Sequence, residues 1–199
     1  MTAVIPDFVA DLYALGVCDE TCAWAAEHAT LQDAWEACNL GGRMAWLLGR
    51  LSGYVDTPAR KKLALVLCEC FDMCPPLTDA DLEVERLRGI DVIRLWARDK
   101  QGIEDLIRWV NTNPFNPLDV VTARPGNAVA SLATGLLESD RVQMALAANK
   151  AITHVVGATA RIMSPESREE FIKNWYAAQD YCARLIRAHY PLAPSLTGE

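Results

Sequence analysis

Apolar residues recur at three- and four-residue steps along most of the chain, with polar residues between them. This spacing puts the apolar side chains on one face of a helix, so it predicts an amphipathic helix wherever it persists. No stretch has the strict alternation of a half-buried strand. We therefore expect an all-α protein, a compact globular bundle of about eight to ten helices. The predicted helices cover residues 5–15, 19–29, 31–38, 44–51, 59–74, 79–99, 103–111, two segments within 128–163, and 165–190.

Capping residues mark several of these helix starts. Thr30 and Asp33 form a Thr-x-x-Asp pattern, in which each side chain can bond to the backbone N–H of the other residue. Thr57 and Ser164 each precede a proline, and a polar cap followed by proline suits the first turn of a helix. These patterns predict that helices begin directly after residues 30, 57 and 164.

Residues 17–51 hold three of the six tryptophans, three of the seven cysteines and a Gly-Gly pair. Gly41-Gly42 is predicted to end the helix before it, because glycine adopts a left-handed cap conformation without steric cost. Trp35, Cys38 and Trp46 are interpreted as apolar anchors of a compact helical corner, with the glycine pair as its hinge. On this interpretation, the stretch contributes to folding. The partner surface is then expected on the charged helices around it.

The length and composition predict a single helical domain over residues 1–199. A chain of 199 residues can bury a sizeable core without disulfides. Residues 111–127 are rich in proline and asparagine, so they are the candidate for a linker between subdomains. The N-terminus lacks the pattern of a signal peptide, and no window approaches the roughly 18 apolar residues of a membrane span. We therefore expect a cytoplasmic protein that does not enter a membrane.

The net charge argues against nucleic acid as a partner. The chain has a formal charge of −7 at pH 7 and a pI near 5.0. A surface of this sign repels phosphate backbones and favours basic partners. An acidic surface can also imitate a nucleic acid, although such a density of carboxylates is ordinary on a globular protein. The sequence has no Walker loop and no dinucleotide-binding fingerprint, so we expect no cofactor.

Two cysteine pairs raise the question of a metal site or a catalytic thiol. Cys18 and Cys22, like Cys70 and Cys74, are four residues apart, which places each pair on one helix face. A structural zinc site more often uses Cys-x-x-Cys turns, and no local signature ties a histidine to these thiols. We predict that the four cysteines are small core residues. Zinc binding or thiol chemistry at the same positions is the alternative.

Charged side chains near the predicted helix starts are the candidate partner contacts. Acids in a first turn stabilise the helix dipole, so capping explains most of them, and they are also the groups that a basic partner would meet. The densest basic run lies near a helix start, where the dipole does not favour cations. The candidates are Asp79, Asp81, Glu83, Glu85, Glu166, Glu169 and Glu170 among the acids, and Arg60, Lys61 and Lys62 among the bases.

The stretch LGVCDETCAWAAEHATLQDAWEACNLGGRMAWLLGRL resembles a module in a helical protein family of phages and prophages, some of whose members are named immunity proteins. The likeness continues through RKKLALVLCECFDM and the closing YCARLIRAHYPL, so it covers most of the chain in order. The family has no agreed catalytic residues, and none is carried over. Many members have an acid and a tryptophan after the turn, where this chain has Gly42-Arg43-Met44-Ala45-Trp46.

The resemblance implies a phage-type accessory protein that binds a host bacterial protein or complex. Our leading hypothesis is stoichiometric inhibition of a bacterial defence or regulatory machine, as by an anti-CRISPR protein, without catalytic or metal-binding residues. One alternative is a thiol- or metal-dependent enzyme, or a zinc-stabilised module, built on the two cysteine pairs. Another is a nucleic-acid-binding protein that uses residues 60–62. The alanine-rich segment 128–163 also allows a homodimer.

Overall fold

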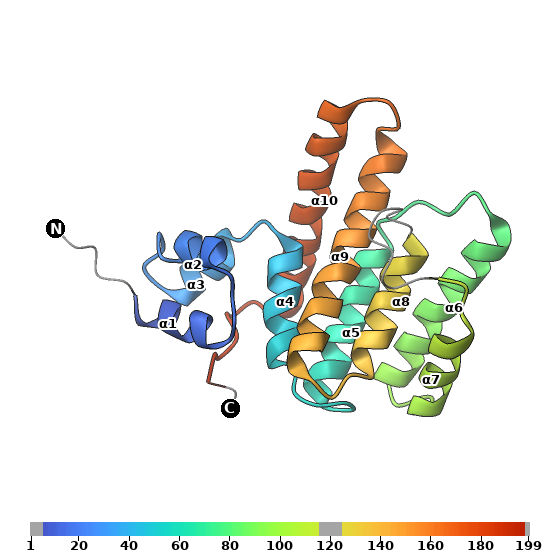
Figure 1. The fold of residues 1–199 in the computed structure, drawn as a ribbon, viewed down its shortest axis with the longest axis horizontal. Coiled ribbons are helices and arrows are strands. Elements are labelled where there is room, and N and C mark those ends of the chain that lie inside the picture. The colour runs from blue at the N-terminus through green and yellow to red at the C-terminus, as the bar shows by residue number, and fades with distance from the viewer. Residues whose placement is uncertain (1–5, 116–124, 198–199) are drawn as a thin grey trace.

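The computed structural model describes residues 6–115 and 125–197. Every regular element in these ranges is an α-helix, so the predicted all-α fold is confirmed, and the ten helices found there match the expected number (Figure 1). They are α1 (Asp7–Ala14), α2 (Asp19–Ala25), α3 (Leu31–Ala37), α4 (Gly41–Leu51), α5 (Pro58–Phe71), α6 (Ala80–Ala97), α7 (Ile103–Thr112), α8 (Pro125–Leu136), α9 (Arg141–Met163) and α10 (Arg168–His189).

The long helix α9 lies at the centre of the fold. It packs against α4, α8, α10 and α5, and α6 joins this bundle by packing on α5 and α8 (Figure 1). Ala145, Ala148 and Ala151 are fully buried along α9, and their small side chains let the neighbouring helices approach closely. The prediction of two tightly packed helices within 128–163 is therefore confirmed, with the break at residues 137–140.

The first three helices form a group on one side of the bundle, opposite α6 and α7 (Figure 1). Hydrogen bonds tie this group to α4 and to the end of α10. Nε of Arg50 donates to the carbonyl of Leu15 at 2.9 Å, and Nε1 of Trp35 donates to the carbonyl of Tyr190 at 2.9 Å. The guanidinium of Arg187 donates to the carbonyl of Cys38. Hydrogen bonds from large side chains to backbone carbonyls therefore join the N-terminal group to the bundle.

The capping signals place most helix starts correctly. The N–H of Asp33 donates to Oγ1 of Thr30 at 3.1 Å and the N–H of Thr30 donates to the Asp33 carboxylate at 3.0 Å, so the predicted capping box is present. Thr57 caps α5, whose first residue is a proline. The start of the last helix was placed too early: Ser167, rather than Ser164, caps α10 by accepting the N–H of Glu170 at 3.2 Å.

The Gly41-Gly42 pair does not end a helix. Helix α3 ends at Ala37, and the two glycines are the first residues of α4, outside the left-handed region. A Cβ on Gly41 would lie 2.5 Å from Cβ of Cys182, and a Cβ on Gly42 would lie 2.6 Å from Oδ1 of Asn149. The pair is needed for close packing of α4 on α10 and α9. Our prediction of a left-handed helix end and hinge is therefore wrong.

The candidate linker at 111–127 lies mostly outside the described residues, which stop at 115 and resume at 125. At the two edges of this gap, the ring of Phe115 lies directly against Gly126. The segment that follows α7 is therefore in contact with the start of α8. Over both described ranges, no helix combines the length and the apolar character needed to cross a membrane.

Candidate functional site

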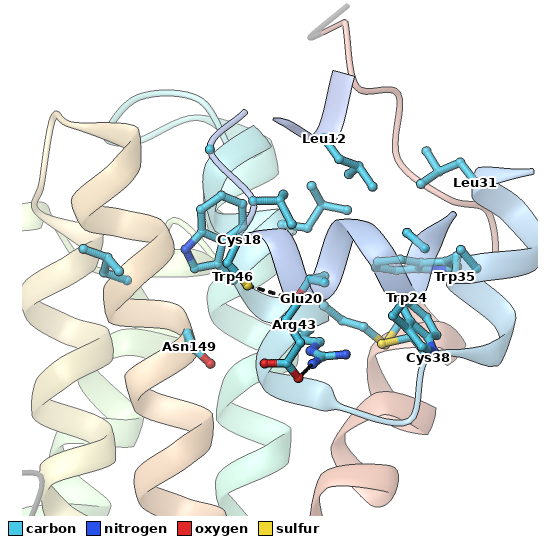
Figure 2. A pocket seen from close by; sticks show the side chains of 18 residues that line it. Leu12, Cys18, Glu20, Trp24, Leu31, Trp35, Cys38, Arg43, Trp46 and Asn149 are labelled. Carbon is cyan, nitrogen blue, oxygen red and sulfur yellow. Dashed lines mark hydrogen bonds and ion pairs between the residues drawn. The ribbon is translucent and has the colours of Figure 1, made fainter. Parts of the chain in front are cut away.

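A pocket of about 530 Å³ lies where the N-terminal group meets α4 and α9 (Figure 2). Most of its lining is apolar, and the polar side chains are few. The lining residues are Leu12, Gly16, Val17, Cys18, Glu20, Thr21, Trp24, Ala25, Leu31, Ala34, Trp35, Cys38, Arg43, Met44, Trp46, Leu47, Leu146 and Asn149.

Three tryptophans form the walls of this tryptophan pocket, one from each of α2, α3 and α4. Figure 2 shows Trp46 on one side of the cavity and Trp24 and Trp35 on the other. Trp35 is buried, whereas Trp24 and Trp46 are half-buried. Indole rings give a large, rigid apolar surface. The walls are therefore suited to contact a flat or aliphatic apolar group.

Turn and cap residues bring these walls together. Gly16 has φ +86, a conformation that costs glycine little, and it turns the chain sharply from α1 toward α2. The capping box at Thr30 starts α3, which presents Trp35 to the cavity. The glycine pair lets α4 sit close to α9 and α10, so that Trp46 of α4 and Asn149 of α9 line the same pocket.

Arg43 and Glu20 form an ion pair within the lining. Nη2 of Arg43 lies 2.9 Å from Oε1 of Glu20, and its guanidinium carbon lies 5.9 Å from the ring centre of Trp24. The two side chains differ in burial, because Arg43 is 28% exposed and Glu20 is 84% exposed. The positive charge is thus partly held in the protein, stacked on an indole, while the negative charge lies in water.

Cys18 is the one exposed member of the seven cysteines, all of which lie in the described residues and none of which is in a disulfide. Its Sγ lies 3.3 Å from Oγ1 of Thr21. This hydrogen bond, with the nearby Arg43 charge, lowers the pKa of the Cys18 thiol below its usual value. Burial raises the pKa of Cys68 to about 12 and also raises that of Cys22. Cys18 is therefore the exposed thiol of the pocket lining, whereas Cys38, which also lines the pocket, is buried and its burial raises its pKa.

The arrangement has little of what thiol or metal catalysis requires. Among the described residues that line the pocket there is no histidine to act as a base for Cys18. His28 instead stacks edge-on against Trp24, with ring centres 4.9 Å apart. No group of three or more His, Cys, Asp or Glu side chains in the described ranges is placed to hold a metal ion. The chemistry best matched by these side chains is the binding of an apolar group.

The chain matches no family model, no curated protein and no solved structure with which it was compared. Its function must therefore be inferred from its own geometry, and the resemblance to phage proteins stays a prediction.

The two predicted cysteine pairs differ in burial. Cys18 precedes α2 and is exposed, while Cys22 is buried on the same helix. Cys70 and Cys74 lie in the core at the end of α5. The prediction that all four are core residues is confirmed for three of them and is wrong for Cys18. An N-cap position at a helix start leaves its thiol at the surface.

The acids of α6 mostly serve the helix itself. Asp79 caps α6 by accepting the N–H groups of Asp81 and Leu82 at 3.1 and 3.0 Å. Glu83 binds Arg86 at 2.6 Å with both side chains largely buried, and this guanidinium lowers the pKa of the Glu83 carboxyl. Glu83 is therefore not free for a partner.

The remaining acids are closer to solvent. Glu85 pairs with Arg88 at 3.4 Å. Asp81 is exposed, as are the three acids at the start of α10. The structure thus leaves a smaller set of candidate acidic contacts than the sequence predicts, and it places them at two separate helix starts: Asp79, Asp81 and Glu85 near the start of α6, and Glu166, Glu169 and Glu170 near the start of α10.

The basic run Arg60, Lys61 and Lys62 does not form one surface. Arg60 is fully buried, so its prediction as a partner contact is wrong. Lys61 is paired with Asp56 at 2.8 Å and with Asp99 at 2.5 Å. Lys62 is exposed, with Nζ 4.1 Å from the ring centre of Tyr190. Three consecutive residues on a helix point in different directions, so a run of charge need not make a patch.

The tryptophan pocket includes two residues that local sequence patterns do not indicate. Leu146 and Asn149 come from the middle of α9, about a hundred residues after the N-terminal group, and they close the pocket on the bundle side. The density of tryptophan in residues 17–51 was the signal that pointed to this region. Interpreting Trp46 only as an apolar anchor missed the cavity, because half-burial cannot be distinguished from burial by helical spacing alone.

Proposed function

We propose that the protein is a binding protein that holds the apolar part of a small ligand in the tryptophan pocket. The observation that carries this proposal is the cavity itself: about 530 Å³, walled by three indoles, with a few polar groups in its lining. Its volume lies within the range of about 300–1,000 Å³ that is typical of small-molecule sites. A pocket with one accessible thiol and no histidine in its described lining favours binding over catalysis.

The length of the ligand's alkyl chain is the variable that tests this proposal most simply. We expect neutral straight-chain alcohols to bind with one ligand per protein and with an affinity that rises about fourfold for each added methylene, because each buried methylene contributes about 0.8 kcal/mol. The rise should stop when the pocket is full. Isothermal titration calorimetry with hexanol, octanol and decanol measures this series.

A pair of variants on α9 shows whether the alcohols occupy this pocket. Leu146 lines the pocket and is 41% exposed, while Val142 lies one turn earlier, is 38% exposed and lies outside the lining. Leu146→Glu should weaken octanol binding about tenfold by replacing apolar contact with a charge, and Val142→Glu should leave it unchanged. Equal affinities in the two variants, or no binding to the wild type, would contradict the proposal.

A groove between α6 and α7, lined by both apolar and charged side chains, supports a second proposal, that the protein also binds a host bacterial protein. The groove has a volume of about 560 Å³. Val84 and Leu87, which line it, are 61% and 47% exposed, and exposed apolar patches of this kind often mark protein interaction sites. This is the surface we assign to the phage-type accessory role, in which the protein inhibits a bacterial defence or regulatory complex.

The test of this second proposal is affinity capture from bacterial lysate with two matched variants. Leu87→Lys places a charge in the groove, and Ile107→Lys places one on exposed α7 outside its lining. We expect a host protein that is captured by the wild type and by Ile107→Lys, and lost with Leu87→Lys. Capture that is the same with both variants would count against the groove as the docking surface.

A further inference from the structure

Arg43 has hydrogen-bonding capacity that its described contacts do not use. A guanidinium has five N–H donors in a planar fork. Within the described residues, its guanidinium donates one N–H to one carboxylate oxygen of Glu20 at 2.9 Å. The remaining donors belong to a side chain that lines the tryptophan pocket and stacks on Trp24. A planar fork of this kind binds carboxylate and phosphate oxygens in pairs.

The partner that now holds Arg43 is easily displaced. Glu20 is 84% exposed, so water can solvate its carboxylate when the pair is broken. Exposed ion pairs are weak, with a strength of less than about tenfold in an equilibrium constant. A ligand whose apolar part already fills the pocket would hold its own anionic group at high local concentration beside Arg43. That group would therefore compete well with Glu20.

The position of Arg43 adds to this preference for an anion. Arg43 lies in the first turn of α4, a helix of 11 residues, where the helix dipole favours negative charge. Among the described residues that line the pocket, Arg43 is the single cation and Glu20 is the single carboxylate. Of these two charged groups, the cation is the more buried, so a ligand gains more by meeting Arg43 than by meeting Glu20.

We propose that the ligand of the tryptophan pocket is an amphiphile with one anionic group, a carboxylate or a phosphate monoester, which binds Arg43 in place of Glu20 while its apolar chain lies between the indoles. This inference rests on the proposed ligand-binding function and specifies its ligand class. An anionic ligand has to displace Glu20, whereas a neutral ligand of the same length leaves the Arg43–Glu20 pair intact, so the preference for an anion depends on the paired hydrogen bonds that the Arg43 fork makes to it.

Ligands that share one alkyl chain and differ in their head group distinguish this inference from the proposed function. Decanol, decanoate, decyl phosphate and decylamine are titrated into the intact protein by calorimetry, at concentrations below micelle formation. We expect decanoate or decyl phosphate to bind about tenfold more tightly than decanol, and decylamine to bind less tightly than decanol. The stronger of the two anions identifies whether the head group is a carboxylate or a phosphate.

Substitutions in the Arg43–Glu20 ion pair test whether Arg43 causes the preference for an anionic ligand. Arg43→Gln should weaken the binding of the preferred anion about tenfold and change decanol binding by less than about twofold. Arg43→Lys keeps the charge and loses the fork, so its affinity for the anion should lie between those of the wild type and Arg43→Gln. Glu20→Gln should strengthen anion binding, since it removes the competitor. Arg184→Gln, on exposed α10 outside the pocket lining, is the charge-matched control. Thermal denaturation confirms that each variant is folded.

One result would overturn the anionic ligand class alone, and another would overturn the proposed function as well. If decanol binds as tightly as both anions, or if Arg43→Gln weakens decanol and the anion equally, the anionic ligand class is overturned and the pocket remains a site for neutral apolar ligands. If none of the four compounds binds the wild type, the proposed function fails and takes this inference with it.

Discussion

Arg60→Met is expected to lower the free energy of unfolding by about 3–5 kcal/mol. The Arg60 side chain is fully buried, and its burial lowers the pKa of the guanidinium. The guanidinium donates to the carbonyls of Gly53 at 2.6 Å and Leu136 at 3.4 Å, and also to that of Glu138. Methionine can replace the volume of the stem, but it leaves these carbonyls without a donor where α5 meets the end of α8.

Urea denaturation followed by circular dichroism measures this loss. For a chain of this length, about 3–5 kcal/mol corresponds to a melting temperature lower by about 10 °C. Lys62→Met is the matched control, because Lys62 is exposed on the same helix, and its change should stay below about 1 kcal/mol. If the two variants are equally stable, Arg60 does not join these elements in the way described.

Gly41→Ala is expected to destabilise the protein by about 2–3 kcal/mol, against the usual helix preference for alanine. The added Cβ would lie 2.5 Å from Cβ of Cys182, 3.1 Å from the backbone nitrogen of Ala183 and 3.1 Å from the carbonyl oxygen of Gln179. These atoms belong to or adjoin the backbone of α10, so no side-chain rotation relieves the contact. The two helices have to move apart instead.

A second glycine at a helix start provides the comparison. Gly102 caps α7, and a Cβ there would meet only the flexible end of Glu104 at 2.4 Å. Gly102→Ala should therefore change stability by less than about 1 kcal/mol. Thermal denaturation of both variants decides the point. A Gly41→Ala protein that is as stable as the wild type would mean that α4 and α10 are not in such close contact.

Local patterns were enough to predict the helices and most of their starts. The capping box at Thr30 and the cap at Thr57 depend on residues within four positions of each other, and both are present. Gly41 was misinterpreted because a glycine serves equally well as a helix end and as a contact surface. Only the position of α10, far along the chain, distinguishes the two.

The site could be predicted only in part. Tryptophan density pointed to residues 17–51, which supply most of the pocket lining, but not to the cavity between them. The burial of Arg60 within a basic run had no local signal, because its partners are carbonyls of α8 and of the loop before α5. Asn149 and Leu146 join the site through the packing of α9. Residues from distant parts of the chain come together at this site through tertiary packing, and the spacing of residues within one sequence does not reveal that packing.

The proposed apolar ligand binds among Trp24, Trp35 and Trp46. The most direct measurement is a titration of ¹⁵N-labelled protein with octanol, followed by the indole N–H signals of the six tryptophans in two-dimensional NMR spectra. We predict that the signals of the three pocket tryptophans shift and saturate together, while those of Trp96, Trp109 and Trp175, which lie outside the pocket lining, stay in place. Unchanged spectra, or shifts confined to the other three tryptophans, would contradict the account.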